Sequence, residues 1–314
     1  MNILLISHIS DPDGITPIIL SKLVFEKVDY ILLESAQTNN KVQELIKNNE
    51  FNKYDKVFIT DLSINEELSI IIENNLNLKD KVKIFDHHLG NKLSKDYSFI
   101  TLIDVDLKGT KQCGTSLYYD FLLNNYTNKD LEKDSVRYFV NLVREYDTWA
   151  WVETNNIEAK NLANLFDVYG RELFENHYLL FLKENDCFYF DEKELFLLEM
   201  FNHKIKTYIE EAKERTIPVN ILGYKAGLVF ASQHRSELGN QLAIYFKDKY
   251  DFIIIVNVER SISYRGIKDI DLNEIAKVFG GKGHFSSSGS PLPANVKKEL
   301  IKIIFDNKVT MIEE

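Results

Sequence analysis

Acidic and histidine side chains follow three short apolar segments within the first ninety residues, the segments 2–7, 56–60 and 81–85. The side chains concerned are His8, Asp11, Asp13, Asp61, Asp86, His87 and His88. Carboxylates gathered at this density repel one another unless a cation neutralises them. Oxygen and nitrogen ligands without thiolates suit Mn²⁺ and Mg²⁺ ahead of Zn²⁺. Because seven ligands exceed the needs of one ion, we expect two ions, which together could activate a water for phosphoryl displacement.

Each of these residues also has an ordinary structural interpretation when it is taken alone. Asp13 and Gly14 form a common turn pair, and Asp61 could simply cap the helix that follows it. It is the presence of such residues after all three segments that favours the metal site.

The segments that would position these residues alternate between two periodicities. Strand-like runs lie at 2–7, 30–33, 56–60 and 81–85, and between them 16–27, 40–49 and 65–74 have the three- and four-residue apolar spacing of amphipathic helices. This alternation predicts a mostly parallel α/β sheet. The carboxyl ends of its strands would lie along one edge, where such folds place their ligands.

The rest of the chain predicts helices and then a second sheet. Helical patterns cover 117–123 and 134–146, and the stretch 172–214 contains neither Pro nor Gly. After Pro218 we expect strands at 219–222, 225–231, 252–258 and 262–265, with helices at 238–246 and 272–278. The predicted fold class is therefore α/β, with an N-terminal parallel-sheet domain at 1–185, a helical connector at 186–216 and a smaller α/β domain at 217–314.

Composition restricts the setting and the partner. A net charge of -10 argues against a protein that holds long nucleic acid mainly through its phosphates, but it is compatible with a small anionic substrate held near bound cations. Two cysteines, Cys113 and Cys187, are too few for a disulfide framework. With no apolar run of about 18 residues, we expect a cytoplasmic protein without a membrane anchor.

Four segments of the sequence resemble motifs of the DHH phosphoesterases. Asp86-His87-His88 resembles the triplet that names the family, residues 7–14 its first motif, Thr60-Asp61 its second, and residues 144–149 its fourth. The resemblance implies that one ion is held by His8, Asp11 and Asp61. It implies that the other is held by Asp13, Asp61, His87 and Asp147, so that Asp61 bridges the two.

The same resemblance assigns roles to the rest of the triplet. His88 would face the substrate phosphate or the leaving group, and Asp86 would orient a neighbouring imidazole. His8 lies three residues before Asp11, whereas many relatives place it four before, so direct coordination by His8 is left open.

A glycine-rich segment at 280–289 resembles the Gly-Gly-Gly-His motif of the DHHA1 domain, with Lys282 in place of the third glycine. By this resemblance Gly281, Lys282, Gly283 and His284 bind the substrate across an interdomain cleft, together with Arg265 from the preceding strand. The planar fork of an arginine suits a terminal phosphate. Taken alone, Arg265 would more often form a surface salt bridge, and the glycines an ordinary loop.

Two aromatic residues follow the fourth motif. Trp149 and Trp151 could stack a base, but packing in the core or between domains is the commoner use of such residues and is what we expect.

The resemblance as a whole implies a phosphoric ester hydrolase of the compact oligoribonuclease group. We expect a Mn²⁺-dependent phosphodiesterase, with Mg²⁺ as the second choice, that hydrolyses nanoRNA or linear dinucleotides to mononucleotides. A compact RecJ-like single-strand exonuclease and a non-catalytic nucleic-acid-binding protein are the alternatives. The oligomeric state is left open, with a homodimer as one option.

Overall fold

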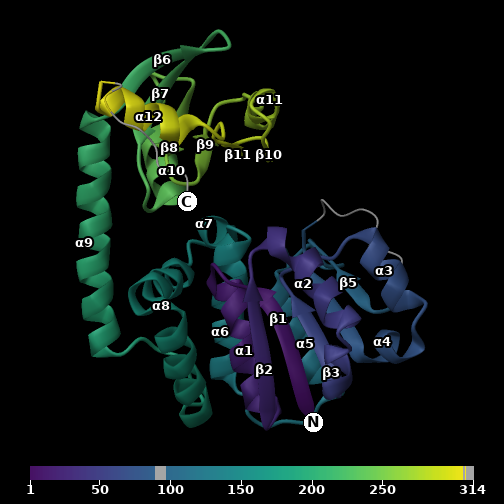
Figure 1. Ribbon diagram of the computed structural model, residues 1–314. Helices are drawn as coiled ribbons and strands as arrows, with labels where there is room; N and C mark the ends of the chain where they lie inside the picture. Colours follow the sequence, from purple (N-terminus) through teal and green to yellow (C-terminus); the bar gives the residue numbers. More distant parts are fainter. Residues whose placement is uncertain (89–96, 307, 309–314) are drawn as a thin grey trace. The chain divides into compact units, whose positions relative to one another are not determined.

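The computed structural model describes residues 1–88, 97–306 and 308. The chain divides into two compact units, Met1–Glu199 and Met200–Glu314, and each is described by itself (Figure 1).

The first unit is built on a parallel sheet of five strands in the order β2-β1-β3-β4-β5. The strands are β1 (Asn2–His8), β2 (Lys27–Leu33), β3 (Lys56–Thr60), β4 (Val82–Asp86) and β5 (Ile100–Leu102). The chain passes from β1 to β2 on one side and then to β3 on the other. The strand order therefore reverses between β1 and β3, and ligands of open α/β sheets bind at such a reversal.

Helices cover both faces of this sheet (Figure 1). They are α1 (Pro12–Val24), α2 (Ser35–Lys47), α3 (Glu66–Glu73), α4 (Leu76–Lys81), α5 (Gly114–Asn125), α6 (Asp134–Asp147), α7 (Ala150–Thr154) and α8 (Ile157–Glu184), with a 3-10 turn at Glu50–Lys53. Alternate residues of β1 serve the two faces: Ile3 and Leu5 pack with α1, α5, α6 and α8, while Leu4 and Ile6 pack with α2, α3 and α4. Burial on both faces explains why the central strands are almost wholly apolar.

The second unit contains a mixed sheet of six strands in the order β10-β11-β9-β8-β7-β6, in which only β7 and β8 pair in parallel. The strands are β6 (Ile217–Ile221), β7 (Tyr224–Phe230), β8 (Phe252–Asn257), β9 (Ser261–Arg265), β10 (Lys282–Gly283) and β11 (Ser287–Pro291). Its helices are α10 (Arg235–Tyr245), α11 (Leu272–Val278) and α12 (Val296–Ile304). One face of the sheet packs on α10 and on the later turns of α9 (Glu192–Glu214), and the other packs on α11.

The predicted fold class is confirmed: a parallel sheet with helices precedes a second, mixed sheet. The boundary between the two units falls inside α9, and Ile205, Ile209 and Ala212 of that helix belong to the core of the second unit. The division at 185 and 216 stays a prediction.

The first helix begins earlier than the residue pattern predicted. We expected it at 16–27, but α1 starts at Pro12 because Asp11 caps it, its side chain accepting a hydrogen bond of 3.0 Å from the Gly14 backbone N–H. Pro12, at the first helical position, has the backbone angle that a helix start requires. None of the helices in the described part of the chain is long and apolar enough to cross a membrane.

Candidate metal centre

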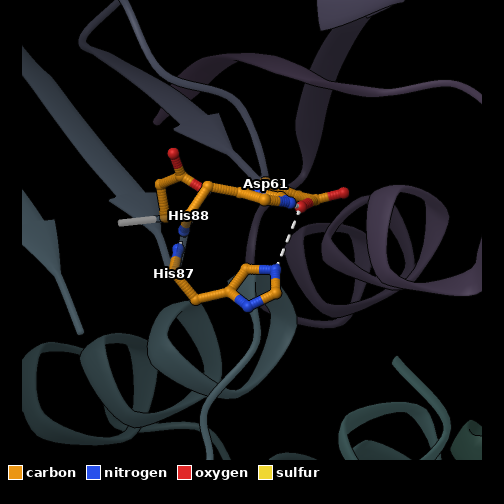
Figure 2. A group of neighbouring side chains, drawn as sticks. Asp61, His87 and His88 are labelled. Carbon is orange, nitrogen blue, oxygen red and sulfur yellow. Dashed lines mark hydrogen bonds and ion pairs between the residues drawn. The ribbon is translucent and has the colours of Figure 1, made fainter. Parts of the chain in front are cut away.

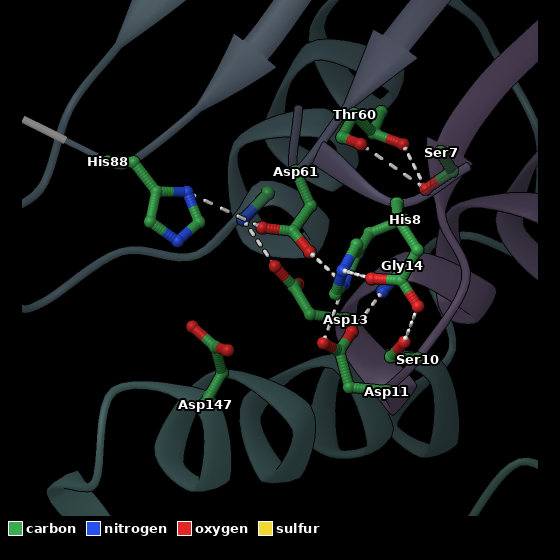
Figure 3. A network of polar contacts seen from close by, with 12 residues as sticks. Ser7, His8, Ser10, Asp11, Asp13, Gly14, Thr60, Asp61, His88 and Asp147 are labelled. Carbon is green, nitrogen blue, oxygen red and sulfur yellow. Dashed lines mark hydrogen bonds and ion pairs between the residues drawn. The ribbon is translucent and has the colours of Figure 1, made fainter. Parts of the chain in front are cut away.

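The predicted acidic and histidine residues converge at one edge of the first sheet. His8 ends β1, Asp11 and Asp13 stand at the start of α1, Asp61 follows β3, and the Asp86 triplet begins at the last residue of β4. Asp147 is the last residue of α6. The carboxylates of Asp13, Asp61 and Asp147 point into the same space (Figure 3).

One group consists of His8, Asp11 and Asp61, with one ligand atom from each within 4.8 Å of the others. The Nδ1 atom of His8 lies 2.7 Å from Asp11 Oδ2 and 3.4 Å from Asp61 Oδ2. The shortened spacing between His8 and Asp11 therefore does not turn the imidazole away from the group. The other ring nitrogen, Nε2, lies 3.6 Å from a carboxylate oxygen of Glu34.

A second group consists of Asp13, His87 and Asp147, within the same 4.8 Å limit. His87 Nε2 lies 3.3 Å from Asp147 Oδ2, yet both atoms are buried and neither has a hydrogen-bond partner in the described part of the chain. His87 Nε2 also lies 3.5 Å from Asp61 Oδ1, a contact drawn in Figure 2. The two oxygens of Asp61 thus face the two groups, one oxygen each.

The electrostatics of these residues call for a positive charge. Burial, together with the charges of Asp13 and Asp11, raises the pKa of Asp61 and of Asp147 well above the usual range. Burial also lowers the pKa of His87, which favours the neutral imidazole that binds metals. His87 Nε2 and Asp147 Oδ2 lack hydrogen-bond partners in the described part of the chain, and all the possible ligand atoms are oxygen or nitrogen. Both features fit divalent cations such as Mn²⁺ or Mg²⁺.

Glycines allow the elements around this centre to approach closely. A Cβ atom on Gly14 would lie 2.0 Å from the carbonyl oxygen of His8, and one on Gly114 would lie 2.7 Å from the backbone nitrogen of Asp61. Asp61 itself has a left-handed backbone with φ of 55°, a conformation that is uncommon outside glycine and is found at functional sites.

Asp13 is held by the start of α5. Its two carboxylate oxygens accept hydrogen bonds of 2.9 and 2.8 Å from the backbone N–H groups of Gly114 and Thr115, and its carbonyl oxygen accepts one from the Thr115 hydroxyl. The positive end of a helix stabilises a carboxylate at this place. A buried aspartate is therefore fixed in one orientation while it keeps lone pairs for another partner.

Asp86 contacts the second histidine of its triplet. Its Oδ1 atom lies 2.8 Å from His88 Nδ1 and accepts a hydrogen bond from the His87 backbone N–H, while Ser63 donates to its Oδ2. Burial alone would raise the pKa of Asp86, but the hydrogen bonds from His88 and Ser63 lower it below the usual value. Asp86 is 1% exposed and the His88 side chain 62% exposed, so a fixed carboxylate holds an accessible imidazole.

The C-terminal residues predicted to bind substrate lie around a separate pocket of the second unit, about 510 Å³ in volume. Its lining includes Arg265, Gly281, Lys282 and Gly283, whereas His284 is exposed and lies outside the lining. A Cβ on Gly281 would lie 2.1 Å from the carbonyl oxygen of Gly289, so the hairpin of β10 and β11 itself requires this glycine.

Residue-by-residue reading of the sequence missed a second arginine in this pocket, Arg235. Its guanidinium contacts Ser261 Oγ at 3.0 Å, and burial together with the charge of Arg235 lowers the pKa of Arg265. Neither arginine forms an ion pair with any residue that the structure describes. No local sequence signal marks Arg235; a Cβ on Gly239, one turn later in α10, would lie 2.4 Å from Arg265 Cγ, which shows how closely α10 approaches β9. Two half-buried arginines with no acidic partner in the described part of the chain favour an anion.

Comparison with known proteins identifies relatives over nearly the whole chain. The model of the DHH family, N-terminal domain, matches residues 2–142. Oligoribonuclease NrnB of Bacillus subtilis (strain 168) is 34% identical over 300 residues, which cover 93% of this chain and 73% of that protein.

Two solved structures share the fold. The pGpG-specific phosphodiesterase PggH from Vibrio cholerae has a TM-score of 0.50 at 14% identity, covering 98% of this chain and all of that chain. RecJ in complex with Mn²⁺ from Thermus thermophilus has a TM-score of 0.52 at 15% identity, covering 98% of this chain and 52% of that one.

Proposed function

Since this chain belongs to the DHH family and is a phosphoric ester hydrolase, we propose that it hydrolyses short oligonucleotides or linear dinucleotides to mononucleotides. The observation that carries the proposal is the position of Asp61 between two ligand groups: Asp61 belongs to the first group, and its other carboxylate oxygen lies 3.5 Å from His87 of the second. The identity to an oligoribonuclease over most of both chains supports the choice of substrate.

We assign the ligands as the family resemblance implies. His8, Asp11 and Asp61 would hold one ion, and Asp13, Asp61, His87 and Asp147 the other, with Mn²⁺ preferred over Mg²⁺. Two such ions, when bound, supply Lewis-acid stabilisation of the attacking and leaving oxygens of a phosphodiester. His88, held by Asp86, would donate a hydrogen bond to the phosphate or to the leaving oxygen.

The pocket of the second unit would hold a phosphate of the substrate. Arg265 and Arg235 would supply the charge and Lys282 an amine, and Gly281 and Gly283 add no side chain to the lining of the same pocket. His284 lies outside the lining of this pocket, and we propose that it binds the substrate as well. We also keep the division into a catalytic part at 1–185, a connector at 186–216 and a substrate-binding part at 217–314.

A panel of substrates of different length tests the proposed function. With Mn²⁺ present, turnover should be fastest on substrates of about two to five nucleotides and should fall steeply on long single-stranded DNA. The reason is that a chain with a net charge of -10 has little positive charge with which to hold many phosphates. A cyclic dinucleotide, a nucleoside 3′,5′-bisphosphate and pyrophosphate complete the panel. Equal rates on a pentanucleotide and on long DNA would favour a RecJ-like exonuclease, and no turnover on any phosphodiester would favour a binding protein.

A further inference from the structure

The two tryptophans of the chain differ in their surroundings. Trp151 packs partly buried against the core of the first unit, whereas Trp149 is 38% exposed. The two rings meet edge to face with centroids 5.5 Å apart. Packing in the core, one of the two uses expected for these residues, therefore holds for Trp151, whereas the Trp149 ring is partly exposed in its own unit.

Trp149 occupies a backbone conformation that a bulky residue rarely adopts. Its φ and ψ are 60° and 12°, in the left-handed region, and it directly follows Thr148, the C-cap residue of α6. Glycine or asparagine normally fills this position after a helix, because a Cβ atom crowds the backbone in this conformation. A tryptophan at a position suited to glycine indicates that its ring has a use which offsets the strain.

The turn that carries Trp149 is fixed from beneath. Glu145 is 7% exposed and accepts hydrogen bonds of 3.1 and 2.8 Å from the side chains of Thr154 and Asn156. These bonds tie the far end of α7 back to α6, and the Trp149 N–H donates to the Tyr146 carbonyl at 3.1 Å. The exposed ring is thus presented by a rigid support.

We infer that Trp149 is a stacking platform for a nucleobase of the substrate, an inference that rests on the proposed function. Trp149 lies two residues after Asp147, so their Cα atoms are at most about 7.6 Å apart. A phosphodiester bound at Asp147 would therefore have its flanking bases within about one nucleotide's length of Trp149. Stacking on an aromatic ring accepts any base, as a non-specific oligonucleotide hydrolase requires.

Replacing Trp149 by glycine and by tyrosine tests the inference. Glycine suits the left-handed turn, so Trp149→Gly should have the same melting temperature as the unaltered protein, and Mn²⁺ should raise the melting temperature of both equally. Its KM for a dinucleotide should increase roughly 5- to 100-fold, with a smaller change in kcat, and Trp149→Tyr should recover most of the affinity. On a dinucleotide analogue that lacks both bases, Trp149→Gly and the unaltered protein should have the same KM.

Fluorescence gives a second measurement. Trp151→Phe leaves Trp149 as the sole tryptophan of the chain and loses no hydrogen bond seen in the described part, because Trp151 Nε1 has no partner there. The Trp149 emission of this variant should be quenched when the dinucleotide binds and should be unchanged by the base-free analogue.

Opposite outcomes would overturn the inference. A lower melting temperature for Trp149→Gly with an unchanged KM would assign the ring to packing. An equal increase in KM for both the dinucleotide and its base-free analogue would assign it to positioning Asp147. The proposed function fails separately, if the unaltered protein hydrolyses no short oligonucleotide at all.

Discussion

Asp61 is the side chain at which the two ligand groups meet. It is 5% exposed, its backbone is left-handed, and burial together with the neighbouring carboxylates raises its pKa. None of these properties helps the metal-free protein to fold. They are consistent with a residue kept for its two oxygens, which face His8 and His87.

Replacing Asp61 by asparagine should separate function from stability. Asp61→Asn removes a charge that the other carboxylates repel, so the metal-free protein should gain about 0.5–2 kcal/mol of unfolding free energy. Activity should fall by more than about 100-fold, and Mn²⁺ should no longer raise the melting temperature. Thermal melts with and without Mn²⁺, together with dinucleotide turnover, measure both effects. The exposed Asp80→Asn is the matched control, and equal behaviour of the two variants would contradict the role of Asp61.

Asp86 should act through His88 rather than through the metals. Asp86→Asn weakens the contact with His88 Nδ1 and should lower kcat by about 10- to 100-fold. The Mn²⁺-induced rise in melting temperature should remain, because the Asp86 carboxylate is already engaged by His88 Nδ1, the His87 backbone N–H and the Ser63 hydroxyl. Loss of that rise would instead place Asp86 among the metal ligands.

At the residue scale, some residues of the candidate site could be predicted from the positions of the strands, and others could not. The Asp and His side chains that follow three predicted strands indicated seven residues of the centre, because parallel strands bring their carboxyl ends together. Asp147 ends a helix about sixty residues after the triplet, and only the family resemblance indicated it. Arg235 was missed because its significance depends on its contact with Ser261 at the start of β9, which no local pattern encodes.

At the scale of elements, α1 and α5 bring their first turns against the ends of β1 and β3. The Asp13 carboxylate joins the two helices by accepting N–H bonds from Gly114 and Thr115. Buried Ser7 and Thr60 hold the ends of β1 and β3 together through a contact of 2.7 Å between their hydroxyls. The geometry of the ligand groups therefore depends on how closely these elements approach.

Adding one methyl group at α5 should disturb the centre. In Gly114→Ala the new Cβ would lie within 2.9 Å of three atoms of Asp61, so α5 or Asp61 must shift. We expect a loss of about 1–3 kcal/mol of unfolding free energy. Titration with Mn²⁺ should show weaker binding than in the unaltered protein. Thr115→Ser keeps the hydroxyl that bonds Asp13 and should bind Mn²⁺ normally. Normal Mn²⁺ affinity in Gly114→Ala would show that the close approach is not required.

Sequence patterns predicted the central strands well and the ends of elements poorly. The strand at 56–60 agrees with β3 because an uninterrupted apolar run bounded by polar residues has one interpretation. The start of α1 was misplaced because Asp11, Pro12 and Asp13 are polar or rigid residues whose capping role emerges only from their contacts. The short strands β10 and β11 lack an apolar pattern, so the sequence predicted only a glycine-rich turn there.

At the scale of the whole molecule, we expect the chemistry and the choice of substrate to reside in different units. The two ligand groups lie in the first unit, and the pocket with its two arginines lies in the second. A metal centre alone would act on many phosphoesters. The second unit is where we expect the preference for short oligonucleotides to arise.

Removing the arginines should weaken substrate binding without affecting the metals. Arg265→Ala and Arg235→Ala should each raise the KM for a phosphorylated dinucleotide by about 10-fold or more, since a charge-assisted hydrogen bond contributes roughly 1.5–3 kcal/mol. The Mn²⁺-induced rise in melting temperature should be unchanged. Arg260→Ala, exposed in the same unit and outside the pocket, is the control. Unchanged KM values in both pocket variants would exclude this pocket as the phosphate site.

Counting the Mn²⁺ ions bound by each chain tests the two-metal centre most directly. Equilibrium binding of Mn²⁺ to the metal-free protein, followed by electron paramagnetic resonance, should give two ions per chain with the spin coupling of ions that share a carboxylate. Asp61→Asn should lose the coupling. A single ion per chain, or two uncoupled ions that persist in Asp61→Asn, would contradict a centre bridged by Asp61.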